Sequence, residues 1–291
     1  MYRFKILLVV VILQLTTGCV LQFTASKKHV EKTFNKNERN FSKNLTALDE
    51  RETMLATLAP LLQKHRTANA EIIPRFKKES AQLDKEHAEI MRLVARAKGK
   101  MSDIKRLFGS DKEITSDSTK WSEYQGLKSA LSETIDELED TGDDYTERFD
   151  ELIDALEDRG IKNVNRKKMT KSGNEAKKAI NKSLNRSVKA FNKEYKRLAP
   201  RIESSPNKTK IEAKYKRVNE YIAQLRLLVK DAERNLRALM NRHKKQKNFW
   251  VVPGTPSHEN LTRLMAFNTK GDRLSEQINE EVEAINTLMD D

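Results

Sequence analysis

The chain has 291 residues, of which 34% are charged and 37% are apolar, and its formal net charge at pH 7 is +13. It contains only 9 Gly and 6 Pro, so turns are scarce, which argues against a compact domain built from many short elements. Its single cysteine excludes an internal disulfide and a multi-thiolate metal site. The sequence therefore predicts an all-α fold, an elongated antiparallel helical bundle or coiled coil of about five long helices held together by helix packing.

The N-terminus has the features of an export signal. Arg3 and Lys5 precede about ten mostly apolar residues, 6–15, whereas a membrane-spanning helix needs roughly 20. The run closes at Leu15-Thr16-Thr17-Gly18-Cys19, which resembles the lipobox of bacterial lipoproteins, although that family usually has Leu at the place of Thr16. The resemblance implies that residues 1–18 are a removable signal peptide and that Cys19 is acylated.

This resemblance also implies a location in the cell envelope, with the protein held to a membrane by acyl chains. Val20 is not the Asp that marks inner-membrane retention in the family, so in a Gram-negative organism the implied site is the outer membrane, facing the periplasm. Residues 19–28 would be the acylated cysteine and a short tether. The alternatives are an ordinary secretory signal with an incidental cysteine and an uncleaved N-terminal anchor.

Residues 29–108 carry an apolar residue at every seventh position. This spacing predicts a coiled-coil seam, because a 3.5-residue repeat keeps one stripe facing a partner. Pro60 and Pro74 fall on the outer face and leave the heptad phase unchanged, which favours one long kinked helix over 29–108. The alternative is a hairpin that turns at residues 67–70. The seam residues are Phe34, Phe41, Leu48, Leu55, Leu62, Phe76, Leu83, Ile90, Ala97 and Ile104.

Two blocks of opposite charge follow. Residues 120–159 are predicted to form an acidic helix, with 13 Asp or Glu against one Arg between residues 133 and 158. Residues 161–247 are predicted to form a basic helical pair, with 27 Lys or Arg against 7 Asp or Glu. Opposite charges of this kind indicate that these helices lie beside one another, antiparallel, with their flanking charges paired.

The segment 248–256 is predicted to be an apolar loop, and residues 257–291 a C-terminal helix. Phe249 and Trp250 in the loop either plug the end of the bundle's own core, the favoured interpretation, or anchor a partner as exposed aromatic residues do. No repeat of 20–50 residues is detectable beyond the heptads. The heptad seams close either within one chain or between chains, so a homo-oligomer is one prediction.

No motif of an enzyme is present: the sequence has no glycine-rich phosphate loop, no Gly-x-Ser-x-Gly and no His-Glu-x-x-His. We expect no enzyme activity, no cofactor and no bound metal. His87 falls in the first helix's seam and is interpreted as a polar residue that sets register, with a ligand or pH-sensitive role as the alternative. The acidic block is interpreted as a solvated helix face rather than a divalent-cation site.

The sequence therefore predicts a non-enzymatic, membrane-anchored structural or adaptor lipoprotein that contacts other envelope proteins. The alternative is a binding module for an anionic envelope polymer or lipid headgroups through the basic region 161–247. Nucleic acid is not an expected partner of an exported protein. A third interpretation is that the basic charges only solvate the helices and pair with the acidic block. The candidate partner-binding residues are Lys167, Lys168, Lys171, Phe249 and Trp250.

Overall fold

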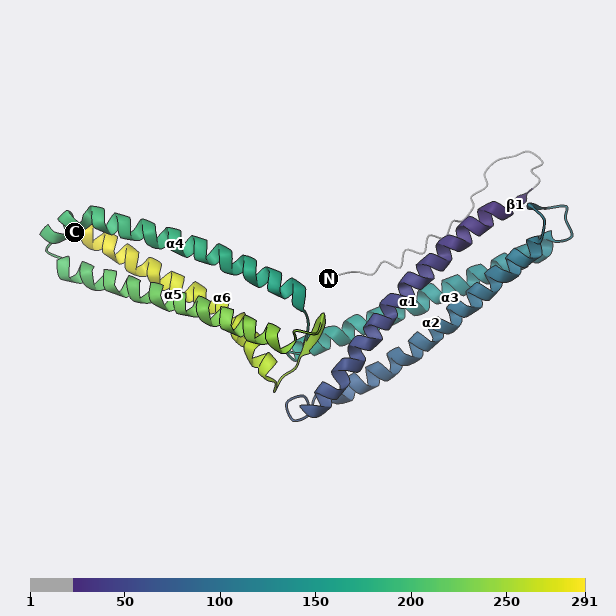
Figure 1. The fold of residues 1–291 in the computed structure, drawn as a ribbon, viewed down its shortest axis with the longest axis horizontal. Helices are drawn as coiled ribbons and strands as arrows, with labels where there is room; N and C mark the ends of the chain where they lie inside the picture. The colour runs from purple at the N-terminus through teal and green to yellow at the C-terminus, as the bar shows by residue number, and fades with distance from the viewer. Residues whose placement is uncertain (1–22, 291) are drawn as a thin grey trace. The chain divides into compact units, whose positions relative to one another are not determined.

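The computed structural model describes residues 23–290 and divides into two compact units, Met1–Arg159 (unit 1) and Gly160–Asp291 (unit 2) (Figure 1). Residues 23–290 form six long helices and two pairs of very short antiparallel strands. The predicted all-α helical class is confirmed, with six helices in place of about five. Among these described residues, no helix is both long enough and apolar enough to cross a membrane.

Unit 1 is a bundle of three antiparallel helices. Lys105 on the second helix lies 3.3 Å from Glu38 on the first, and Arg96 on the second lies 3.0 Å from Glu137 on the third, so each helix runs opposite to the one before it. The short strands pair with one another at one end of the bundle. In chain order the elements are β1 (Thr24–Ser26), α1 (Lys27–Lys64), α2 (Ile73–Phe108), β2 (Glu113–Thr115) and α3 (Trp121–Asp158).

The prediction of one kinked helix over 29–108 is wrong, and the alternative hairpin is the structure found. α1 ends at Lys64, and Pro74 lies in the first turn of α2, where its missing N–H costs no hydrogen bond. Asn69 interrupts the apolar seam in the intervening turn; it is only 4% exposed and donates its side-chain amide to the His65 carbonyl at 2.8 Å. The heptad phase is the same on both sides of the turn because each helix presents its own seam to the core.

The predicted seam residues of 29–108 are all buried in unit 1. The third helix buries Tyr124, Leu131, Leu138, Tyr145 and Leu152 at the same seven-residue spacing. The core of unit 1 therefore extends along the length of its helices without interruption.

Unit 2 is a second antiparallel three-helix bundle. Lys177 pairs with Glu233 across its first two helices at 2.7 Å, and Lys214 pairs with Glu281 across the last two at 2.9 Å. The first helix starts directly after Asn165, whose side chain caps it by accepting from the Lys168 amide. Residues 248–251, expected as loop, form a strand. The elements are β3 (Lys162–Asn165), α4 (Arg166–Ser204), α5 (Lys208–Arg242), β4 (Asn248–Val251) and α6 (Pro256–Asp290).

Both units have the same order of elements: strand, helix, helix, strand, helix. In both, the first helix starts directly after the first strand, and its first amide donates to the residue before the second strand. The bonds are Lys27 N–H to the Lys112 carbonyl at 2.8 Å and Arg166 N–H to the Lys247 carbonyl at 3.0 Å. The chain is thus a tandem repeat of one supersecondary unit. The two copies share the order and approximate length of their elements. A search for sequence repeats of 20–50 residues does not detect a repeat of this kind.

The prediction that the acidic helix packs beside the basic helices is wrong. The acidic helix α3 packs in unit 1, where Arg148 pairs with Glu79 and Glu86 of α2, whereas the basic helices α4 and α5 pack in unit 2. Apolar seams select the neighbours here, since an exposed ion pair contributes only about 0–1 kcal/mol. Gly160–Asp291 therefore has 30 Lys or Arg against 15 Asp or Glu, a net charge of +15, whereas Met1–Arg159 has 26 against 28.

Candidate functional site

A cavity of about 600 Å³ lies between the three helices of unit 2. Its volume falls within the roughly 300–1,000 Å³ range of ligand pockets. The apolar part of the lining comes from all three helices: Ile180, Leu184, Val188, Phe191, Val218, Ile222, Leu225, Val229, Phe267, Ile278 and Val282.

The cavity lies where the core of unit 2 is interrupted. One buried cluster contains Ile202, Ile211, Val218, Ile222 and Ile285, and a separate cluster contains Leu239, Phe249, Val251 and Leu261. Between them, α4 contributes only half-buried side chains, and Ile202 near its C-terminal end is its one buried residue. The middle of α4 thus leaves its apolar face partly uncovered.

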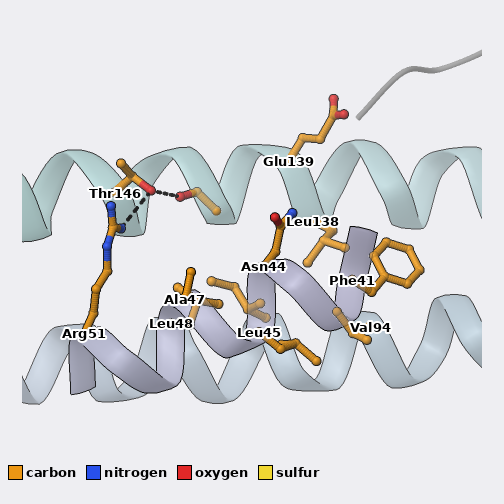
Figure 2. Close-up of a pocket in the computed structure, with 12 residues that line it drawn as sticks. Phe41, Asn44, Leu45, Ala47, Leu48, Arg51, Val94, Leu138, Glu139 and Thr146 are labelled. Carbon is orange, nitrogen blue, oxygen red and sulfur yellow. Dashed lines mark hydrogen bonds between the residues drawn. The ribbon is translucent and has the colours of Figure 1, made fainter. Parts of the chain in front are cut away.

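Unit 1 has only a small hollow at the comparable place between its helices (Figure 2). That pocket measures about 40 Å³ and is lined by large side chains such as Phe41 and Leu48. Arg51 of α1 crosses toward α3 and donates to the Thr146 hydroxyl at 3.2 Å. Since both units have the same element order, the large cavity of unit 2 results from its side chains and not from its topology.

The opening of the cavity lies between α4 and α6. Ser183 and Ser187 of α4 line the cavity and are also exposed, as are Asn268, Asp272, Ser275 and Asn279 of α6. Asp272 is the only charged residue of the lining. Gly271 faces open space, because a Cβ built on it would meet no atom within 4 Å. The cavity therefore has an apolar interior and a rim of small polar side chains.

Basic side chains also occur on α4 outside the cavity lining. Residues 177–189 contain five Lys or Arg and no acidic residue. Lys177 is paired with Glu233, and the other four, Lys178, Lys182, Arg186 and Lys189, are exposed. This stretch of α4 therefore presents positive charge to solvent, apart from the cavity lining.

The predicted lysines Lys167, Lys168 and Lys171 lie in the first two turns of α4, and their side chains are exposed. Cys19, the predicted lipidation site, lies outside the described residues 23–290. The structure brings the three lysines together at one end of α4.

Phe249 and Trp250 are buried, with exposed fractions of 3% and 5%. The Phe249 ring stacks on His243, with ring centroids 3.8 Å apart and planes 4° from parallel. The side chain also packs into the cluster that contains Leu239 and Leu261. The structure places both aromatic residues in the core of unit 2, as the plug interpretation requires, and not on its surface.

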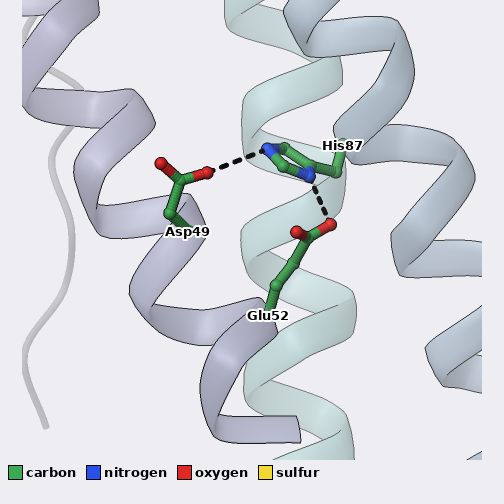
Figure 3. A group of neighbouring side chains, drawn as sticks. All are labelled: Asp49, Glu52 and His87. Carbon is green, nitrogen blue, oxygen red and sulfur yellow. Dashed lines mark hydrogen bonds and ion pairs between the residues drawn. The ribbon is translucent and has the colours of Figure 1, made fainter. Parts of the chain in front are cut away.

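His87 lies between two carboxylates of α1 (Figure 3). Its Nδ1 contacts the Glu52 carboxylate, and its Nε2 lies 3.7 Å from an Asp49 oxygen. Ligand atoms of the three residues lie within 4.8 Å of one another, a spacing from which they could hold a divalent cation. Each ring nitrogen already faces a carboxylate of α1, so these contacts also help to fix the pairing of α1 and α2. This contribution to helix pairing agrees with the predicted register role of His87.

Tyr145, close to this polar group, provides a pH test of unit 1. Its hydroxyl is buried without a hydrogen-bond partner among the described residues, and burial raises its pKa from 10.0 to about 12. Between pH 10 and 12 the unfolded chain loses this proton while the folded chain keeps it, so the free energy of unfolding must fall as pH rises. We expect urea unfolding to show this fall for the wild type relative to Tyr145→Phe. Parallel pH profiles of the two proteins would contradict this assignment.

The cavity was not among the sites predicted from the sequence. Its signal in the sequence is weak: Ser183 and Ser187 adjoin apolar positions of α4, and Gly271 lies within α6. Small residues near an apolar stripe leave a cavity only if the side chains of the facing helices do not fill the space. The sequence does not identify those facing helices, so it could not predict the cavity.

No family model matches the chain, and neither a curated protein nor a solved structure matches it. Its function therefore has to be inferred from its own residues.

Proposed function

We propose that this chain is a non-enzymatic structural or adaptor lipoprotein of the cell envelope, anchored by acyl chains on Cys19. Within it, unit 2 binds an anionic envelope component, either lipid headgroups or an acidic polymer. The observation that carries this proposal is the segregation of charge, since unit 2 has a net charge of +15 and the acidic helix α3 belongs to unit 1.

The placement of the basic residues supports such a role for unit 2. α4 has 13 Lys or Arg against 3 Asp or Glu, and most of its basic side chains are exposed. A Lys or Arg near an anionic membrane surface contributes roughly 1 kcal/mol of attraction. Several such residues acting together are sufficient for binding that depends strongly on salt.

The length of the helices supports the structural part of the proposal. α4 has 39 residues, which corresponds to about 58 Å at ~1.5 Å per residue. The other five helices have 35–38 residues each. Long bundles of this kind span distance and present extended helical surfaces to partners.

Co-sedimentation tests the binding role. The chain starting at Val20, which lacks the acylated cysteine, is mixed with anionic phosphatidylglycerol vesicles, neutral phosphatidylcholine vesicles or purified cell-wall sacculi. We expect it to pellet with at least one anionic material and not with neutral vesicles. Pelleting should decline steeply as salt rises from about 50 to 500 mM, since the Debye length shortens. Absence of pelleting at low salt with both anionic materials would leave only a spacer role.

Metabolic labelling tests the anchor. An alkyne-tagged fatty acid is expected to label the wild-type protein, and Cys19→Ser is expected to remove the label completely, because the chain has no other cysteine. A wild type that is exported but unlabelled would favour the ordinary secretory signal, and a label that persists in the variant would place the acyl chain elsewhere.

A further inference from the structure

We propose that the cavity of unit 2 binds the acyl chain of a single-chain amphiphile of fatty-acid size. The proposal goes beyond the function inferred above and does not depend on it, because it is argued from the apolar lining of the cavity. Apolar side chains line the cavity, and transfer of an acyl chain into it removes the apolar surfaces of both from water.

The dimensions of the cavity suit an acyl chain. Its α5 wall extends from Val218 to Val229, which corresponds to about 16 Å at ~1.5 Å per residue. One leaflet of a bilayer's hydrocarbon core is about half of ~30 Å, so an extended membrane acyl chain has a similar length. The cavity volume of about 600 Å³ also lies in the range of sites that enclose small ligands.

The distribution of polar residues orients the ligand. Apolar side chains of all three helices line the interior, whereas serine and asparagine side chains are confined to the α4–α6 opening. An amphiphile that enters through this opening can bury its chain and keep its headgroup at the rim, where hydroxyl and amide groups can donate hydrogen bonds.

The charged residue of the cavity lining, Asp272, lies on the α6 side of the opening. Its carboxylate disfavours an acidic headgroup near itself, so we expect the headgroup to lie against α4, where the Ser183 and Ser187 hydroxyls can donate hydrogen bonds. The exposed basic residues of α4 between 177 and 189 lie outside the cavity lining.

Gly271 offers a substitution that fills the cavity. A side chain at this position would enter open space, and replacing a glycine inside a helix raises helix propensity. Gly271→Phe is therefore expected to fold and to occupy the volume that the acyl chain needs. Gly99→Phe is the matched control, because Gly99 lies in α2 of unit 1, is exposed and also has no atom within 4 Å of a built Cβ.

The test uses the delipidated chain from Val20 and dansyl-undecanoic acid as the fluorescent probe. Titrations are run in about 1 M NaCl, where a Debye length of roughly 3 Å suppresses surface attraction. We expect saturable binding of one probe per chain by the wild type and by Gly99→Phe. Gly271→Phe should bind at least about tenfold more weakly, a loss that displacement of two methylene groups already produces. Thermal unfolding by circular dichroism checks that each variant folds.

Three results would overturn the proposal: no probe binding by the wild type, equal binding by Gly271→Phe, or an equal loss in Gly99→Phe. If Gly271→Phe fails to fold, Ser275→Leu at the exposed rim replaces it, and the same outcomes apply. If the wild type self-associates and does not bind the probe, while Gly271→Phe is monomeric, the cavity would be a binding site for a second copy of the chain. That result would also overturn the proposal. Vesicle pelleting that persists without probe binding would overturn this inference and leave the proposed function intact.

Discussion

Phe249→Ala is expected to destabilise unit 2 by about 3–5 kcal/mol, the usual cost of removing a buried phenylalanine from a core. The side chain is almost completely buried, packs against Leu239 and Leu261, and stacks on His243. The space cannot easily collapse, because the surrounding cluster also connects β4 to the helices. The loss should be confined to unit 2, since unit 1 has its own core.

The two tryptophans allow the units to be followed separately. Trp121 lies in unit 1 and Trp250 in unit 2, so urea unfolding in a Trp121→Phe background reports unit 2 through Trp250. Leu227→Ala is the control, because Leu227 is 60% exposed and its removal should change stability by no more than about 0.5 kcal/mol. A free energy of unfolding of unit 2 in Phe249→Ala that lies within about 1 kcal/mol of the parent's value would contradict the plug assignment, because removal of a buried phenylalanine usually costs more.

Reversing the three lysines at the start of α4 should have the largest effect on binding. Substitution of Lys167, Lys168 and Lys171 by Glu removes three exposed positive charges and adds three negative ones. At roughly 1 kcal/mol per basic residue near an anionic surface, affinity for anionic vesicles or sacculi should fall at least about a hundredfold. The measurement is the salt-series co-sedimentation of the chain from Val20.

The matched control reverses three exposed lysines of unit 1, Lys36, Lys43 and Lys98, and so makes the same change in total charge. We expect this variant to keep most of the affinity. Equal losses in the two triple variants would show that binding follows the net charge of the whole chain, and would contradict a binding role specific to unit 2.

The heptad pattern predicted the helices and the buried face of unit 1 because apolar burial dominates helix packing. It did not show the reversal of the chain after Lys64, since Pro74 can occupy either a helix face or a first turn, and a constant phase fits both. The polar Asn69 within the seam was the available signal, and its hydrogen bond to His65 explains why a buried amide is tolerated there.

Charge was a poor guide to helix neighbours. The net charges of α3 and α4 suggested that they pair, but exposed ion pairs are too weak to override the apolar seams that sort the helices into two units. The cavity could not be predicted because it depends on volume left between three helices. Phe41 and Leu48 fill the corresponding space of unit 1, whereas Ser183 and Gly271 leave space in unit 2.

Hydrogen–deuterium exchange of the chain from Val20, with and without anionic vesicles at low salt, tests most directly whether unit 2 is the binding unit. We expect slower exchange in α4 and along the α4–α6 opening when vesicles are present, and unchanged exchange in α1, α2 and α3. Protection confined to unit 1, with no change in unit 2, would contradict the proposed division of roles.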